Sequence, residues 1–173
     1  MRRLSITTAI VPPPARVPQL VLLIGIQASG KTAFYRERFF ASHVRISRDL
    51  LRTPAREAAF LALCVSTGMD AVIDNTNPSR ADRARFIAPA RAAGFAVSGY
   101  CFATDLPGAL ARNAALARNA AREGAARIPD AGLRNCAARL AAPTRDEGFD
   151  ALYQAILLPQ GGFLITEWHD GIL

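Results

Sequence analysis

The chain has 173 residues, of which 51% are hydrophobic, so it is long and apolar enough to bury the core of one globular domain. Its 21 basic residues against 14 acidic ones give a net charge of +7, which favours negatively charged partners. No apolar run approaches the roughly 20 residues that span a bilayer, which excludes a transmembrane helix.

Neither the N-terminus nor the cysteines indicate an exported protein. Residues 1–18 are broken by prolines and too weakly apolar for a secretory signal, so we predict a loose arm before a single domain over 19–173. Cys64, Cys101 and Cys136 are far apart and form no Cys-x-x-Cys or Cys/His cluster. This spacing predicts reduced thiols in a cytoplasmic protein, with neither a disulfide framework nor a zinc site.

The stretch LIGIQASGKT at 23–32 contains the pattern Gly-x-x-x-x-Gly-Lys-Thr, which is typical of phosphate-binding loops. It follows QLVLLIG, an apolar run that predicts a buried parallel strand. It precedes AFYRERFF, whose spacing favours a helix with one buried face. Strand, glycine loop and helix is the order that the motif requires, and the only lysine of the chain, Lys31, lies within it.

Each residue type in this loop has a chemical role. Glycine permits backbone angles and a close approach that a side chain would block, and successive amides at a helix start point toward phosphates. The Lys31 ammonium reaches the β- and γ-phosphates, and the Thr32 hydroxyl holds magnesium. The pattern therefore predicts ATP and Mg²⁺ as cofactors, bound by Gly25, Ala28, Ser29, Gly30, Lys31 and Thr32.

Strands and helices alternate through the middle of the chain. HVRIS (43–47) predicts a second strand, and Thr53 and Pro54 are suited to begin a helix over about 54–66. DAVIDNTN (70–77) predicts a third strand that ends at Asp74. We expect Asn77 to cap the following helix, which Pro78 opens and Gly94 closes.

The remaining segments continue this alternation. FAVSGYCFA (95–103) predicts a fourth strand, followed by an alanine-rich helix from about Asp105, a loop through Pro129 and a last helix, DAGLRNCAARLA. FDALYQAILL and GFLITEW predict short strands or a hairpin near Gly161 and Gly162. The order predicts an α/β fold with a central parallel sheet and helices on both faces.

Phosphoryl transfer also needs a group that positions or deprotonates the incoming hydroxyl. Asp49 directly follows the second predicted strand, and the carboxyl ends of such strands gather at the ligand crevice. Arg48 and Arg52 flank it. The alternative reading of Asp49 is a helix cap or a surface ion-pair partner.

Taken together, these segments resemble the kinase domain of polynucleotide 5′-hydroxyl kinases, including the kinase half of the bifunctional kinase/phosphatases. The resemblance runs from about residue 20 to 158 and rests on GIQASGKT, SRDLLR, VIDNTNPSRADRARFIAPARAAG and APTRDEGF. The third and fourth segments are its most specific part. It implies a P-loop kinase-like three-layer sandwich with a lid around 112–130, and transfer of the γ-phosphate of ATP to a DNA or RNA 5′-hydroxyl.

The resemblance also implies roles for single residues. Asp49 matches the general base, Arg52 matches an arginine near the acceptor strand, and Asp74 matches an aspartate near the magnesium. We also expect Arg48, which flanks Asp49, and Asp74 to contact the acceptor. A helix cap is the alternative role for Asp74. An R-x-x-x-R pair on the late helix matches lid arginines that clasp the ATP phosphates and assist catalysis.

Three arginines on that helix compete for the lid role. Arg118 and Arg122 are four residues apart on one face and Arg112 is rotated away, so we choose Arg118 and Arg122, with a solvated helix face as the alternative.

Two other functions stay open. Ser47 stands where many relatives have asparagine, and the helix over 54–66 is largely apolar. A kinase of the same fold that phosphorylates a small molecule, such as a nucleoside, sugar or antibiotic, is therefore the alternative. A nucleotide-binding regulatory module without turnover is the third hypothesis.

Overall fold

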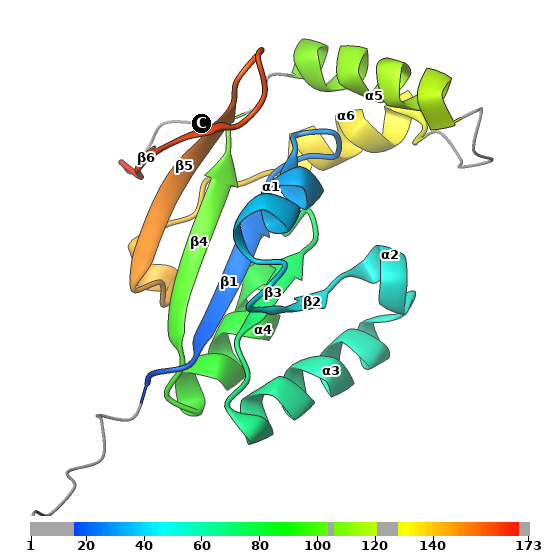
Figure 1. The fold of residues 1–173 in the computed structure, drawn as a ribbon. Coiled ribbons are helices and arrows are strands. Elements are labelled where there is room, and N and C mark those ends of the chain that lie inside the picture. The colour runs from blue at the N-terminus through cyan, green and yellow to red at the C-terminus, as the bar shows by residue number, and fades with distance from the viewer. Residues whose placement is uncertain (1–15, 104–105, 121–127, 170–173) are drawn as a thin grey trace, which may run out of the picture.

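Six strands form one sheet in the order β2-β3-β1-β4-β5-β6 in a computed structural model that describes residues 16–103, 106–120 and 128–169 (Figure 1). β1 to β5 are parallel, and β6 is antiparallel to β5. The strands are β1 (Gln19–Ile24), β2 (Val44–Ile46), β3 (Ala71–Asp74), β4 (Ala96–Phe102), β5 (Ala151–Leu157) and β6 (Phe163–Glu167).

Helices cover both faces of this sheet and its carboxyl end. In Figure 1, α1 lies in front of the sheet and α4 behind it, while α5 and α6 lie above the ends of the central strands. The helical segments are α1 (Lys31–Arg38), α2 (Arg48–Leu51), α3 (Pro54–Thr67), α4 (Arg80–Ala92), α5 (Leu106–Ala120), α6 (Asp130–Arg139) and the 3-10 turn η1 (Arg145–Glu147).

The core is split by the sheet because successive residues of a strand point to opposite faces. On β1, Leu20 and Leu22 pack against α3 and α4, while Val21 and Leu23 pack against Phe34 of α1. Both faces are buried, as expected for a parallel sheet between helices. The predicted α/β three-layer sandwich is confirmed, and so is the C-terminal hairpin, which turns at Gly161 and Gly162.

The predicted start of α4 was wrong by two residues. Ser79, not Asn77, is the N-cap, and its hydroxyl accepts a hydrogen bond from the amide of Asp82 at 3.1 Å. Asn77 has a left-handed backbone with φ of 45°, and its Nδ2 donates to the carbonyl of Leu23 at 2.7 Å. Its side chain is therefore used to join the loop after β3 to β1, so it cannot cap the helix.

The first described residues are attached to the domain, and the three cysteines lie in its interior. Arg16 forms an ion pair with Asp70, whose Oδ1 also accepts from the amide of Gln19 at 2.8 Å. The arm before residue 16 lies outside the described residues. Cys64, Cys101 and Cys136 are buried free thiols, and burial raises the pKa of Cys101 to about 12. Within the described ranges, no helix has the length and hydropathy to cross a membrane.

A buried ion pair joins α4 to the segment after α6. Arg83 donates from Nε and Nη2 to the Glu147 carboxylate at 2.6 and 2.7 Å. Its Nη1 donates to the carbonyls of Asn77, Pro78 and Ala141. Arg83 thus connects the two stretches on which the family resemblance is most specific, and it fixes the loop after β3.

We expect Arg83→Met to destabilise the fold by about 3–5 kcal/mol, because it leaves the buried carboxylate of Glu147 without its cation. Urea unfolding measures this loss. Arg80→Met is the matched control, since Arg80 forms an exposed ion pair with Asp146 from the same helix. A loss of stability no larger than that of the control would contradict a structural role for the buried pair.

Candidate active site

A cavity of about 940 Å³ opens at the carboxyl end of the central strands, where open α/β sheets bind ligands. The phosphate loop, α2, the loop after β3 and one face each of α4, α5 and α6 contribute to its wall. Its acidic lining residues are Asp49, Asp74 and Asp82. Among the described residues that line it, the cations are Lys31, Arg36, Arg48, Arg85, Arg112 and Arg139.

The loop over residues 25–30 has a backbone that requires glycine at two places. Gly25 and Gly30 have φ of 154° and 97°. A Cβ on Gly25 would lie 3.0 Å from the Cβ of Phe102, and one on Gly30 would lie 3.2 Å from the Phe163 ring. Because α1 begins at Lys31, the loop runs directly into a helix N-terminus, where free amides favour anions. Ala28 and Ser29 complete the loop and line the cavity.

The Lys31 ammonium is buried inside this loop. Its Nζ donates to the carbonyls of Gly25 at 2.9 Å and Ile26 at 2.5 Å, and to the Ser29 hydroxyl at 3.2 Å. Burial lowers the pKa of Lys31 to about 8, and the charges of Asp74, Cys136 and Asp49 oppose that shift. The ammonium is thus charged at neutral pH, yet poorly solvated, which suits it to bind an anion.

Thr32 and Asp74 meet at the start of α1 and the end of β3. The Thr32 Oγ1 donates to Asp74 Oδ2 at 3.0 Å, and the Asp74 side chain is almost fully buried. Mg²⁺ takes oxygen ligands and is held by one or two protein groups together with phosphates and water. The hydroxyl and carboxylate oxygens therefore fit Mg²⁺ bound jointly with a nucleotide.

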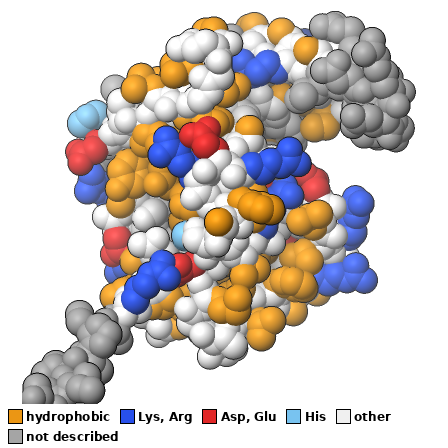
Figure 2. Space-filling view, in the orientation of Figure 1, with side chains coloured by type: hydrophobic (Ala, Val, Ile, Leu, Met, Phe, Trp, Pro, Cys, Tyr) orange, Lys and Arg blue, Asp and Glu red, His pale blue; other side chains and the backbone are white. Residues whose placement is uncertain are grey.

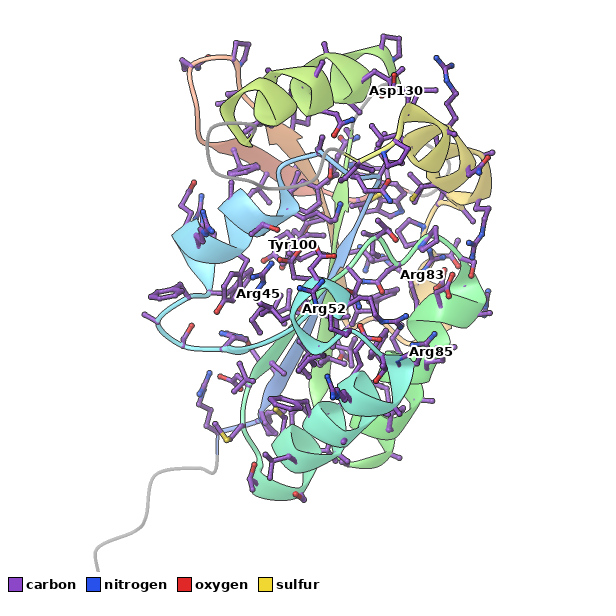
Figure 3. All side chains as sticks on the ribbon, turned by 90° about the vertical axis from the view of Figure 1, so that its right-hand side faces the viewer. Arg45, Arg52, Arg83, Arg85, Tyr100 and Asp130 are labelled. Carbon is purple, nitrogen blue, oxygen red and sulfur yellow. The ribbon has the colours of Figure 1, made fainter. Side chains whose placement is uncertain are left out.

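Sequence reasoning missed Arg45, a residue of β2 that Figure 3 labels and whose guanidinium contacts Asp74. Its Nε donates to Asp74 Oδ2 at 2.8 Å. Arg45 lies opposite Val72 in the parallel pairing of β2 with β3, and Asp74 is two residues further on the same face. The strand register, which the sequence did not supply, would have placed these two charges together.

Asp49 lies in the first turn of α2, where its exposed side chain lines the same cavity as Lys31. A buried carboxylate holds this turn in place. Glu57 of α3 accepts from Arg48 Nε at 2.9 Å and from Asn75 Nδ2 at 2.7 Å. The Asn75 Oδ1 in turn accepts from the Arg48 amide at 2.8 Å. The proposed base is therefore tied to the residue that follows Asp74.

The buried Glu57 is a second functional residue that sequence reasoning missed. It shares the buried face of α3 with Leu61 and Cys64, four and seven residues later. A single charge within an apolar stripe is the signal that could have identified it.

The arginines fall into three groups. Arg48 lines the cavity, whereas Arg52 is exposed and is not among the lining residues. Arg112, which the helical-face argument set aside, donates from Nε to the carbonyl of Ala28 at 2.8 Å and lines the cavity. The Arg118 side chain and Arg122 lie outside the described residues, so their lid role stays a prediction. Arg112 reaches the phosphate loop because α5 packs over that loop. The helical periodicity of the sequence does not reveal this packing.

Comparison with solved structures shows the same fold at low sequence identity. A chain of the PezAT chromosomal toxin–antitoxin system of Streptococcus pneumoniae matches with a TM-score of 0.65 and 15% identity over 87% of this chain and 71% of that one. A fungal RNA kinase matches with a TM-score of 0.55 and 11% identity over 91% and 79%. A gluconokinase from Sinorhizobium meliloti 1021 matches with a TM-score of 0.53 and 17% identity over 82% and 84%.

A family model described as an AAA domain matches residues 46–143. This span begins after the phosphate loop and contains Asp49, Asp74 and Arg112. The fold is the one seen in the two kinases compared above. Because the family model covers more than half of the chain, the protein belongs to the AAA domain family.

Proposed function

We propose that this protein is an ATP-dependent phosphotransferase whose acceptor is the 5′-hydroxyl of a polynucleotide. The observation that carries this proposal is that Lys31, Thr32, Asp74 and Asp49 line one cavity. A phosphate-binding loop and a carboxylate in the same cavity are the two parts that transfer to a hydroxyl requires. The family and the kinase fold of the neighbours support the reaction class.

The donor half of the site binds ATP. The loop amides and the Lys31 ammonium hold the phosphates, and Arg112 lies against the loop at Ala28. Thr32 and Asp74 would hold Mg²⁺, which offsets charge on the phosphate oxygens when it is bound with the nucleotide. Arg118 and Arg122 remain proposed lid residues, within a lid around 112–130 of the domain over 19–173.

The acceptor half uses Asp49. Its carboxylate accepts the proton of the attacking hydroxyl while the new oxygen–phosphorus bond forms and the bond from the γ-phosphorus to the bridging oxygen breaks. ADP leaves and the acceptor becomes a phosphate monoester. Glu57 and Asn75 keep α2 in place, so the carboxylate is positioned before the substrate arrives.

The proposed acceptor is supported by the charge of the cavity and of the whole chain, and by similarity to one solved structure. Arg48 and Arg85 are paired with Glu57, and Arg139 with Asp82, but the described residues that line the cavity still include six cations against three carboxylates. The whole chain carries +7, and one structural neighbour is an RNA kinase. On the face seen in Figure 2, basic side chains are scattered among hydrophobic ones. The cations of the cavity therefore carry the argument for a phosphate-containing acceptor. A small-molecule hydroxyl is the alternative, favoured by the gluconokinase neighbour.

We expect the protein to transfer label from γ-labelled ATP with Mg²⁺ to a 5′-hydroxyl oligonucleotide. Asp49→Asn should lower kcat by at least about 100-fold, as expected for loss of a general base, with ATP affinity unchanged. Lys31→Ala should weaken ATP binding itself. Asp146→Asn, which changes an exposed carboxylate paired with Arg80, is the matched control and should keep full activity.

Each outcome of this assay has one meaning. The oligonucleotide is tested beside nucleosides, sugars and other small alcohols. Label on a small compound alone would replace the polynucleotide with the alternative acceptor. Nucleotide binding without transfer to any acceptor would leave a regulatory module and contradict the proposed reaction.

We also expect nucleotide affinity to fall as pH rises above about 8, the pKa of the buried Lys31 ammonium. Bound phosphates stabilise the charged form, so binding at higher pH must take up a proton, and the affinity falls by up to about tenfold per pH unit. Below pH 8 this contribution is constant. Calorimetric titration with ADP from pH 7 to 9.5 measures the effect.

Lys31→Arg is the control for this pH dependence, because arginine stays protonated throughout the range. Its affinity for ADP should be independent of pH above 8. A flat curve for the unmodified protein, or the same fall in the arginine variant, would contradict the role given to the ammonium.

A further inference from the structure

Arg45 places a positive charge against both predicted magnesium ligands, Thr32 and Asp74. Its Nε and Nη2 both contact Asp74 Oδ2, at 2.8 and 2.6 Å, and its Nη2 lies 3.4 Å from the Thr32 Oγ1. The guanidinium also lies over the Tyr35 ring, 5.5 Å from its centroid. The side chain is four-fifths buried and is not among the residues that line the cavity. It thus reaches Asp74 from β2 without itself lining the cavity.

The charges at this point do not favour a bare cation. The Asp74 carboxylate is paired with Arg45, so the two together are neutral. The Lys31 ammonium is close enough for Asp74 to raise its pKa, and it adds a second positive charge. The carboxylate of Asp49 is also near Lys31. These two carboxylates and two cations balance one another, whereas a divalent cation needs an excess of negative charge.

We propose that Arg45 makes Mg²⁺ binding conditional on the nucleotide. By neutralising Asp74, it weakens the affinity of Thr32 and Asp74 for a free divalent cation. The phosphates of a bound nucleotide restore the negative charge, so the metal enters as a metal–nucleotide complex. The two short contacts to Oδ2 also fix the carboxylate rotamer, which keeps the Thr32 hydroxyl oriented. This inference rests on the proposed nucleotide-binding function, but not on transfer to an acceptor.

The test measures metal binding and not turnover. Mn²⁺ replaces Mg²⁺ as the probe, because its free concentration can be read by electron paramagnetic resonance. Titrations are made without nucleotide and with saturating ADP. We expect Arg45→Met to bind Mn²⁺ at least about tenfold more tightly than the unmodified protein when ADP is absent, because one nearby positive charge is removed. With ADP present, the difference should be smaller, since the phosphates dominate the charge.

Three further variants make the outcome specific. Arg45→Gln removes the charge but keeps a hydrogen-bond donor, so it tests the same idea if Arg45→Met does not fold. Asp74→Asn combined with Arg45→Met should abolish the increase in Mn²⁺ affinity, because that increase comes from the unpaired carboxylate of Asp74. Arg91→Met removes an arginine paired with Asp150 beside the amino-terminal end of β4 and should leave Mn²⁺ binding unchanged.

Mn²⁺ binding that is unchanged or weaker in both Arg45 variants, with Arg91→Met as reference, would overturn the proposal. Failure of the unmodified protein to bind ADP at all would instead count against the proposed function. Because ADP binding is measured first, these two failures are distinguishable.

Discussion

The site depends on the attachment of the phosphate loop to the end of β3. Thr32 donates to Asp74, the Gly25 amide donates to the carbonyl of Thr76 at 3.0 Å, and Asn77 donates to the carbonyl of Leu23. These bonds join the loop to the segment that follows the neighbouring strand. Without them, the buried ammonium of Lys31 and the carboxylate of Asp74 would have no fixed separation, and no metal–phosphate geometry could be preorganised.

The second half of the site is attached to the first through buried charges. Glu57 connects the turn that bears Asp49 to Asn75, and Arg83 holds the same loop from the other side through Asn77 and Pro78. Glu57 and Arg83 are both fully buried, so removing the partner of either would leave an unpaired charge in the protein interior. The loop after β3 is therefore the common support of the proposed donor and acceptor halves, which explains why so many polar side chains converge on it.

The sequence was sufficient for the parts of the fold that local chemistry determines. Periodicity, the Thr53 cap and the glycine loop predicted the strands, α3 and the start of α1, and the alternation of strands and helices predicted the sandwich. It could not supply features that depend on register or packing. Arg45 meets Asp74 only through the pairing of β2 with β3, and Arg112 reaches Ala28 only because α5 packs over the loop. The Asn77 cap failed for the same reason, since a contact with β1 uses that side chain.

The most direct test of the central claim is a crystal structure with Mg²⁺ and a non-hydrolysable ATP analogue. One hydroxyl must bridge the terminal phosphorus and the Asp49 carboxylate, so the phosphorus should lie about 5 Å, and at most about 6.5 Å, from the nearest carboxylate oxygen, with the phosphate against Lys31 Nζ. A terminal phosphate that points away from α2, too far from Asp49 for a single hydroxyl to span, would contradict the account.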